Sequence, residues 1–384
     1  MKKFFLLTKY FSFLLALFAV FALMACKHDQ KLETPDPTPN PSPNPGPNPT
    51  PDPSNKEYLS YETQGIPFTM VRIPDCKAQR ISSRFQGAYG LIYVTLSPFY
   101  MMETEVTQEL YYSVMGENPS KFTESDIEEG EEQMKRPVEC VSWTDAVIFC
   151  NKLTEDVMGA EECVYDIGGG PAEKGSIKMI VNDEGKIERK GFRLPSSTEW
   201  EWACRGGHYQ PIQYIGPVLP ETEFEGLDEL EEQARYARID ELNKKCWAML
   251  PEYAWVGKEG KNKTHEVKKK KPNLYKLYDM SGNVAEWVWD TFLDDDSLGN
   301  YPDYIKKGEP VPEDIVKINP FGPEPQSTDD KITIRGSTTV PPDKNFPPHL
   351  LFYHSSCTYR LGSTVNSTAN WLGFRIVCGE LNGE

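Results

Sequence analysis

The chain has 384 residues and a formal net charge of −17, with 39% hydrophobic and 12% aromatic residues. This apolar content is enough for a sizeable core and excludes a chain that is disordered throughout. The surplus of carboxylates argues against a nucleic-acid partner, because phosphate binding needs clustered Lys and Arg. The one basic run, Lys268 to Lys271, is short and more typical of a solvated loop than of a binding patch.

Residues 1–25 have the pattern of a secretory signal peptide. Lys2 and Lys3 precede an apolar run over residues 11–24, which is shorter than the roughly 20 residues that a membrane span needs. The end of this segment, Leu23 to Cys26, is similar to the lipobox of bacterial lipoproteins. We therefore expect cleavage before Cys26 and lipidation of its thiol, so that lipid chains hold the protein at a membrane surface without spanning it. An ordinary secreted protein with a cysteine at this place is the alternative.

Residues 26–55 predict a stalk. From Thr34 to Ser54 nearly every second residue is proline, and such a segment extends as polyproline II instead of forming a core. Its length gives a reach on the order of 60 Å. We expect the lipid and stalk to place one folded domain, residues 56–384, outside the cytoplasm in a bacterial cell envelope. Exposure at the outer-membrane surface is left open.

Three segments of this domain carry helix signals. A helix is predicted from Thr107 to Gly116. Ser142 and Asp145 form a capping-box-like start, and Ser196 with Glu199 repeats the device. The apolar stripe that follows Ser142 comprises Ala146, Val147, Cys150 and Leu153.

Short strands are predicted between long polar loops, for example from Phe68 to Ile73 and from Phe374 to Val377. A few helices, short strands and much irregular backbone indicate an α+β domain.

Six sequence blocks carry a family resemblance. They are Phe99 to Thr107, Pro137 to Trp143, Phe192 to Ala203, Leu277 to Trp287, Ile334 to Ser337 and Gly373 to Arg375. In this order they resemble the blocks of formylglycine-generating enzymes, also called sulfatase-modifying factors. The resemblance implies a C-type-lectin-like fold. The tryptophans of these blocks are expected to be core anchors, because a large ring buries much apolar area and needs one polar partner. They are Trp143, Trp200, Trp202 and Trp287.

The catalytic pattern of this family is missing here. The enzymes that the chain resembles hold copper with two cysteine thiolates shortly after an Arg-Gly-Gly-Ser stretch. After Arg335-Gly336-Ser337 this chain has no cysteine before Cys357. Counting back from Cys357 places Pro347 and Phe352 at the two thiolate positions. Counting forward from Arg335 places Pro341 and Phe346 there. Neither side chain offers a ligand to Cu(I), so we expect no copper and no formylglycine-generating activity.

The resemblance also implies a disulfide between Cys204 and Cys357. An oxidising compartment would permit it, and closing so long a loop would stabilise by about 4 to 5 kcal/mol in the chain-entropy estimate. The sequence leaves the pairing of these cysteines open: Cys76, Cys140, Cys150, Cys163, Cys246 and Cys378.

A calcium site is a further implication of the resemblance. The matching positions are Asp279, Gly282, Val284 and Glu286, where two carboxylates, two backbone carbonyls and waters could supply the six to eight oxygens that Ca²⁺ takes. The alternative is a turn in which Glu286 caps a backbone group or pairs with an arginine.

We therefore interpret the domain as a non-catalytic binding module for a protein or glycan ligand. The candidate contact groups lie near the C-terminus: Phe352, Tyr353, His354, Tyr359, Asn366, Asn370 and Trp371. The layout resembles that of one branch of this family. Members of that branch are surface receptors, and retroelements diversify their sequence just before the Gly-Phe-Arg block, which corresponds here to residues 349–371. The alternatives are a formylglycine-generating oxidase that uses other cysteines and a structural scaffold in an envelope or motility complex.

Overall fold

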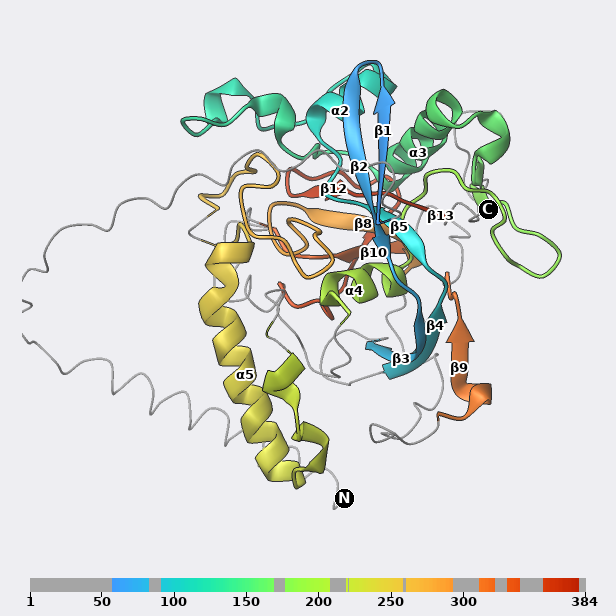
Figure 1. The fold of residues 1–384 in the computed structure, drawn as a ribbon. Helices are drawn as coiled ribbons and strands as arrows, with labels where there is room; N and C mark the ends of the chain where they lie inside the picture. Colours follow the sequence, from blue (N-terminus) through green and yellow to red (C-terminus); the bar gives the residue numbers. More distant parts are fainter. Residues whose placement is uncertain are drawn as a thin grey trace, which may run out of the picture. The chain divides into compact units, whose positions relative to one another are not determined.

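The computed structural model describes residues 57–82, 91–168, 177–207, 219, 221–257, 260–292, 311–321, 330–338 and 355–379. These residues form four sheets and four α-helices, which confirms the predicted α+β class (Figure 1). The predicted signal peptide, Cys26 and the stalk lie outside the described residues. None of the helices in the described ranges is both long and apolar enough to cross a membrane.

One antiparallel sheet joins the beginning and the end of the described chain. Its strand order is β1-β2-β5-β13, with β1 at Tyr58–Thr63, β2 at Ile66–Ile73, β5 at Phe99–Met102 and β13 at Val377–Gly379. Each neighbouring pair is antiparallel. The predicted strand from Phe68 to Ile73 lies within β2.

The second sheet has β8 near its centre, in the order β11-β10-β8-β12. Its strands are β8 (Ala285–Thr291), β10 (Lys331–Arg335), β11 (Leu361–Thr364) and β12 (Leu372–Phe374), and β12 runs parallel to β8. Two smaller sheets complete the set. They comprise β3 (Cys76–Ser82), β4 (Leu91–Leu96) and β9 (Val316–Ile318), and the pair β6 (Tyr165–Asp166) and β7 (Lys178–Met179).

The predicted strand from Phe374 to Val377 is wrong, because the chain changes sheets within it. Strand β12 ends at Phe374 and β13 begins at Val377. Between them the Arg375 side chain turns into the interior, where it is fully buried, and the Ile376 carbonyl accepts a hydrogen bond from Met102 N. The period-two pattern therefore breaks at Arg375.

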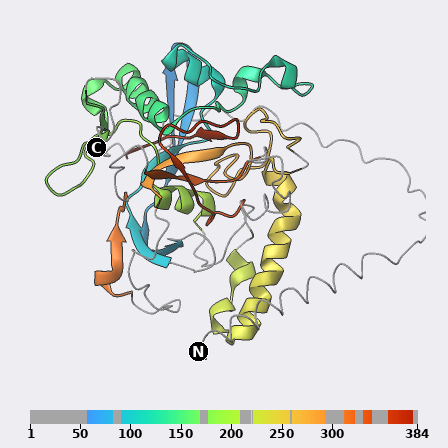
Figure 2. The ribbon, with the colours of Figure 1, turned by 180° about the vertical axis from the view of Figure 1, so that it is seen from behind.

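The three predicted helices are confirmed at their predicted starts. They are α2 (Gln108–Met115), α3 (Trp143–Val157) and α4 (Ser197–Arg205). Thr107 caps α2, which ends at Gly116 in the left-handed conformation. Both serine caps form complete capping boxes. Seen from behind, α3 lies beside the β1–β2 hairpin (Figure 2).

Helix α5 (Glu232–Tyr253) was not predicted. It buries a narrow stripe of Leu242, Cys246 and Leu250, which are spaced by four residues, among many charged positions. So narrow a stripe, with Pro251 inside the helix, gives a weak periodic signal. Short 3₁₀ turns are found at Glu124–Asp126, Gln133–Lys135, Ala160–Glu162, Glu221–Phe224, Leu227–Glu229 and Glu313–Ile315.

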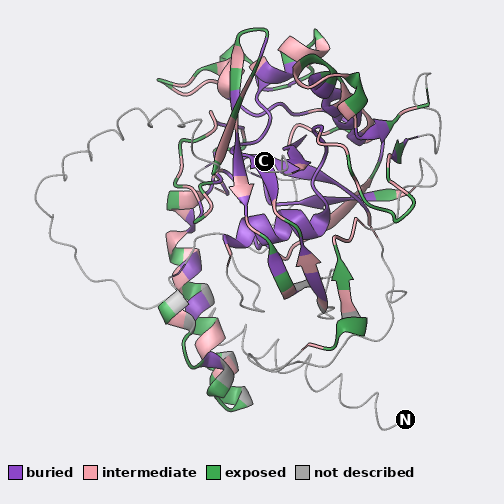
Figure 3. Cartoon of the chain, turned by 45° about the vertical axis from the view of Figure 1, so that its right-hand side comes forward, coloured by how far each residue is buried: buried purple, intermediate pink, exposed green. Residues whose placement is uncertain are grey.

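The four expected tryptophan anchors are all buried, and every residue of α4 is buried as well (Figure 3). Each indole N–H donates to one acceptor: Trp143 to Val288 O, Trp200 to Glu286 Oε2, Trp202 to Pro74 O and Trp287 to Val141 O. The rings therefore fill the core with their polar atom satisfied.

Candidate functional site

The turn between Asp279 and β8 contains three residues in the left-handed backbone conformation. Asp279, Gly282 and Asn283 all have positive φ, of 54°, 90° and 58°. A Cβ on Gly282 would stand 2.2 Å from Trp255 O, so this position requires glycine. Asn283 N donates to the same Trp255 carbonyl at 3.0 Å, which fastens the turn to the segment before it.

Glu286, the last residue of the expected calcium set, is held by other groups. Arg375 Nε donates to both of its carboxylate oxygens at 2.9 and 2.8 Å, and Nη2 donates to Oε1 at 2.8 Å. Trp200 Nε1 donates to Oε2 at 2.7 Å. The arginine-pairing alternative for Glu286 therefore describes this structure, and its partner is the arginine of the closing Gly-Phe-Arg block.

Asp279 keeps a free oxygen. Its Oδ2 accepts a hydrogen bond from Lys268 N at 3.0 Å, whereas its buried Oδ1 has no hydrogen-bond partner. Burial raises the pKa of Asp279 to about 6. A buried carboxylate oxygen without a hydrogen-bond partner is available to bind a cation, so Asp279 fits a calcium site.

Glu105 faces the same turn from the segment before α2, and sequence reasoning assigned it no role. Its Oε1 accepts from Val284 N at 3.0 Å and its Oε2 from Asn283 Nδ2 at 2.8 Å. Burial, followed by the charges of Asp279 and Glu286, raises the pKa of Glu105 well above its ordinary value. Within the described ranges no group of three or more His, Cys, Asp or Glu side chains is arranged to hold a metal ion. A site here would need backbone carbonyls, and calcium remains a proposal.

Cys204 at the end of α4 and Cys357 lie in one hydrophobic cluster. Burial raises the pKa of Cys204 well above its ordinary value, and the nearby Cys357 thiol adds to the shift. Arg335 Nη2 joins their surroundings, donating to Cys357 O and to Glu201 Oε2, both at 2.7 Å. The structure contains no disulfide bond between these two cysteines, so the disulfide remains a prediction.

The expected ligand-contact residues are only partly described. Phe352, Tyr353 and His354 lie outside the described residues, as do the candidate thiolate positions Pro341, Phe346, Pro347 and Phe352. Asn366 is exposed, and three others are half-buried: Tyr359, Asn370 and Trp371.

Trp371 is half-buried and also contacts the core. Its ring packs against the hydrophobic cluster around β8, and its carbonyl accepts a hydrogen bond from Ala285 N at 2.8 Å. Cys140, which is half-buried, lies next to this segment because its N–H donates to Ala369 O at 3.0 Å. Sequence reasoning did not connect Cys140 with the C-terminal residues.

Each lysine of the basic run has a partner inside the protein. Lys268 pairs with Glu103, Lys269 with Glu266, Lys270 lies over the Trp255 ring and Lys271 pairs with Glu252. The run therefore stabilises a loop, as expected.

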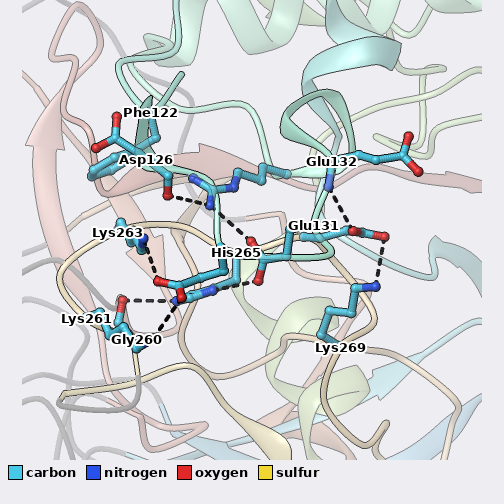
Figure 4. A network of polar contacts seen from close by, with 12 residues as sticks. Phe122, Asp126, Glu131, Glu132, Gly260, Lys261, Lys263, His265 and Lys269 are labelled. Atoms are coloured by element: carbon cyan, nitrogen blue, oxygen red, sulfur yellow. Dashed lines mark hydrogen bonds and ion pairs between the residues drawn. The ribbon is translucent and has the colours of Figure 1, made fainter. Parts of the chain in front are cut away.

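A second charged cluster joins residues 117–136 to residues 260–269, and we call it the loop clamp. Glu131 accepts from Arg136 Nη2 at 3.0 Å and contacts His265 Nδ1 at 2.9 Å (Figure 4). Glu128 pairs with Lys261 at 2.9 Å and Lys263 at 2.6 Å. Sequence reasoning missed this cluster. The acidic run near Glu128 and the basic residues after Lys261 were the available signal.

Comparison with known proteins identifies the family. The model of the sulfatase-modifying factor enzyme 1-like domain matches residues 63–379, so the chain belongs to this family. It is 35% identical over 214 residues to the chaperone protein LppX of Paenibacillus barcinonensis, covering 53% of this chain and 66% of that protein. It is 28% identical over 193 residues to the formylglycine-generating enzyme of Mus musculus, covering 50% of this chain and 40% of that protein.

Among solved structures, Treponema denticola variable protein 1 resembles the chain with a TM-score of 0.59 and 30% sequence identity. The match covers 84% of this chain and 99% of that chain. The fold is therefore that of formylglycine-generating enzymes. Because the chain spans only 66% and 40% of the two curated relatives, their activities are not transferred with the fold.

Proposed function

We propose that the protein is an envelope lipoprotein whose domain binds a partner and does not oxidise a substrate thiol. The observation that carries this proposal is the state of the cysteines. None occurs between Arg335 and Cys357, and burial raises the pKa of Cys76 to about 11 and those of Cys140 and Cys378 to about 12. Thiols with such pKa values supply few thiolates for copper near neutral pH.

The comparisons support a binding role without assigning a ligand. Treponema denticola variable protein 1 shares the fold over nearly its whole length, and its name describes a variable protein. The relative LppX is named a chaperone protein, a name that suits a protein-binding role. We propose a protein or glycan ligand at the surface around Asn366, Asn370 and Trp371.

Two measurements decide between binding and oxidation. The purified protein, loaded with copper and incubated aerobically with a Cys-x-Pro-x-Arg peptide, should leave the peptide thiol intact. Copper-dependent conversion of that thiol to an aldehyde would refute the proposal. A pull-down from intact envelopes should retain a partner, and Trp371→Ala should release it. Stoichiometric recovery of an envelope complex that Trp371→Ala does not disturb would favour a structural scaffold.

Lipidation of Cys26 is proposed from the lipobox-like sequence, and the LppX similarity supports it. Palmitate fed to producing cells should label the protein. A Cys26→Ser variant that still incorporates the label would disprove this anchor.

The Cys204–Cys357 disulfide is supported by the shared burial of the two thiols. Peptide mapping without reductant should recover the two cysteines in one linked peptide. Recovery of both as alkylated free thiols from native protein would remove this proposal.

Calcium at the Asp279–Glu286 turn is supported by the unpartnered Asp279 Oδ1. Carboxylate and carbonyl oxygens suit a hard cation. Titration calorimetry of the purified protein should detect calcium binding that EGTA reverses. A flat titration would refute the site.

A further inference from the structure

His265 lies inside the loop clamp with an acceptor at each of its ring nitrogens. The side chain is 1% exposed. Its Nδ1 is 2.9 Å from Glu131 Oε1, and its Nε2 is 3.1 Å from the carbonyl oxygen of Gly260 (Figure 4). Neither a carboxylate nor a carbonyl can donate a hydrogen bond. Both contacts are therefore hydrogen bonds only when both ring nitrogens carry a proton, which is the imidazolium form.

The groups in contact with the ring favour this charged form. Burial acts to raise the pKa of Glu131, but contacts with His265 and Arg136 outweigh it and lower the pKa, so Glu131 is a carboxylate near neutral pH. The Trp255 ring stacks on the imidazole, with centroids 3.9 Å apart and an angle of 15° between the planes. An aromatic face attracts a cation. Lys270 Nζ also lies over this indole, 3.9 Å from its centroid, and is an opposing positive charge.

Other charged groups reach His265 through its backbone and its own segment. His265 N donates to Asn283 Oδ1, and Asn283 Nδ2 donates to His265 O and to Glu105 Oε2. Burial raises the pKa of Glu105 well above its ordinary value, so this carboxylate is a second group whose titration must be told apart from that of His265. Within the clamp, Lys263 pairs with Glu128 at 2.6 Å.

The contact of His265 with Glu131 is the most buried ion pair that the described structure has between the two segments of the clamp. Its side chains are 1% and 8% exposed, against 60% for Lys261, 19% for Lys263 and 30% for their partner Glu128. His265 is also the only histidine in the described ranges, and the other four lie outside them. Histidine is the side-chain type whose charge ordinarily changes between about pH 5 and 8.

We propose that the loop clamp is a proton-operated latch between residues 117–136 and 260–269, closed when His265 is an imidazolium and opened when it loses a proton. A neutral ring has one N–H, so one of its two nitrogens becomes a lone pair that faces an acceptor oxygen. At the same time Glu131 loses one of its two charged partners and keeps only Arg136. The latch is therefore closed at mildly acidic pH and opens as the pH rises.

The acidic side of the latch is able to open without unfolding the core. Its regular structure consists of two 3₁₀ turns, Glu124–Asp126 and Gln133–Lys135, and no residue of either turn is buried. Segments with few buried contacts are the ones that open locally in native proteins. Loss of the His265 proton should therefore release this loop and leave the sheets intact.

Amide hydrogen exchange of the purified protein from about pH 5.5 to 8 tests the latch. Protection factors divide out the intrinsic exchange rate at each pH. Over residues 124–136 and 260–267 they should fall about tenfold as the pH rises, while those of α3 should stay constant. In His265→Gln, which has no titrating group at this position, protection of both segments should be low and independent of pH.

Variants of the two clamp glutamates show which contact carries the response. In Glu131→Gln the fall in protection should move to lower pH, because the carboxylate that favours the imidazolium is gone. Glu128→Gln is the matched control, since its partners are Lys261 and Lys263 and lysine ordinarily keeps its charge over this range. It should keep the wild-type pH response.

Two results of these exchange measurements would overturn the latch. One is protection of residues 124–136 that does not change with pH in the wild type. The other is an equal pH response in wild type and His265→Gln, which would assign the response to Glu105 or to another group.

Nitrogen NMR of wild-type protein labelled at its histidines decides the matter if His265→Gln does not fold. The His265 ring is identified by its proximity to the Trp255 ring protons. It should carry two protons at about pH 5.5 and one at about pH 8. A ring that keeps the same number of protons over the whole range overturns the latch.

Discussion

The loop clamp and the Asp279–Glu286 turn both contain acidic side chains, but the two regions differ in how many positively charged partners these side chains have. In the clamp, Glu128 meets Lys261 and Lys263, while Glu131 contacts Arg136 and His265. In the turn, Glu105 and Asp279 form no ion pair with a described residue. In a balanced cluster the charges offset one another, whereas unbalanced buried carboxylates are candidates for a ligand site.

Breaking the ion pair between Arg375 and Glu286 should have the largest effect on the free energy of unfolding. Arg375→Met removes the partner of Glu286 and leaves a buried, uncompensated carboxylate, so the free energy of unfolding should fall by about 3 to 5 kcal/mol. Urea unfolding measures this loss. Lys186→Met is the control, because Lys186 and its partner Glu184 are both solvent-exposed. An equally small change in the two variants would show that the Arg375 pair is not structural.

The cost of burying a carboxylate should also appear at Asp290, in the pH dependence of stability. Burial raises its pKa to about 7, although Ser197 N donates a hydrogen bond to it. The folded state therefore holds a proton that the unfolded state releases near pH 4, and stability should fall as pH rises from about 4 to 7. Asp290→Asn should remove up to about 4 kcal/mol of this pH dependence. Urea midpoints over this pH range check it. Parallel wild-type and variant curves would contradict it.

Within the loop clamp, the more deeply buried glutamate should contribute more to the free energy of unfolding. Glu131 contacts the buried Arg136 and His265, so Glu131→Gln should cost about 2 to 3 kcal/mol of unfolding free energy. Burial raises the pKa of Glu131, but hydrogen bonds from His265 and Arg136 outweigh it and lower the pKa. The contribution of Glu131 is therefore lost as pH falls through the folded-state value.

Glu128→Gln is the matched comparison, because Lys261 is exposed. Its effect on the melting temperature should be smaller than that of Glu131→Gln and should vanish in high salt. Thermal unfolding at two ionic strengths measures both variants. A Glu128→Gln effect as large as that of Glu131→Gln and independent of salt would contradict the assignment.

The sequence predicted what is decided locally. The capping boxes at Ser142 and Ser196 lie within three residues of their partners, so both helix starts could be read directly. The family blocks predicted the fold. Helix α5 was not predicted because its described buried side chains, Leu242, Cys246 and Leu250, form a narrow stripe that charged residues interrupt.

The site was predicted only in part, because its decisive contacts join distant positions. Asp279 stood in the expected calcium set, but the contact between Glu105 and Val284 spans 179 positions and that between Arg375 and Glu286 spans 89. No spacing rule connects residues so far apart. The charge balance of the turn therefore became visible only in three dimensions.

The melting temperatures of wild type and Asp279→Asn, each with calcium and with EGTA, test the charge-balance account most directly. Ligand at about 100 times its dissociation constant stabilises by about 2.7 kcal/mol, so calcium should raise the wild-type melting temperature of a domain of this size by roughly 4 °C. In EGTA, Asp279→Asn should melt at or above the wild-type temperature, because it removes a buried charge while the amide oxygen can still accept from Lys268 N, and calcium should barely shift it. A variant that melts well below wild type in EGTA yet responds to calcium like wild type would contradict the account.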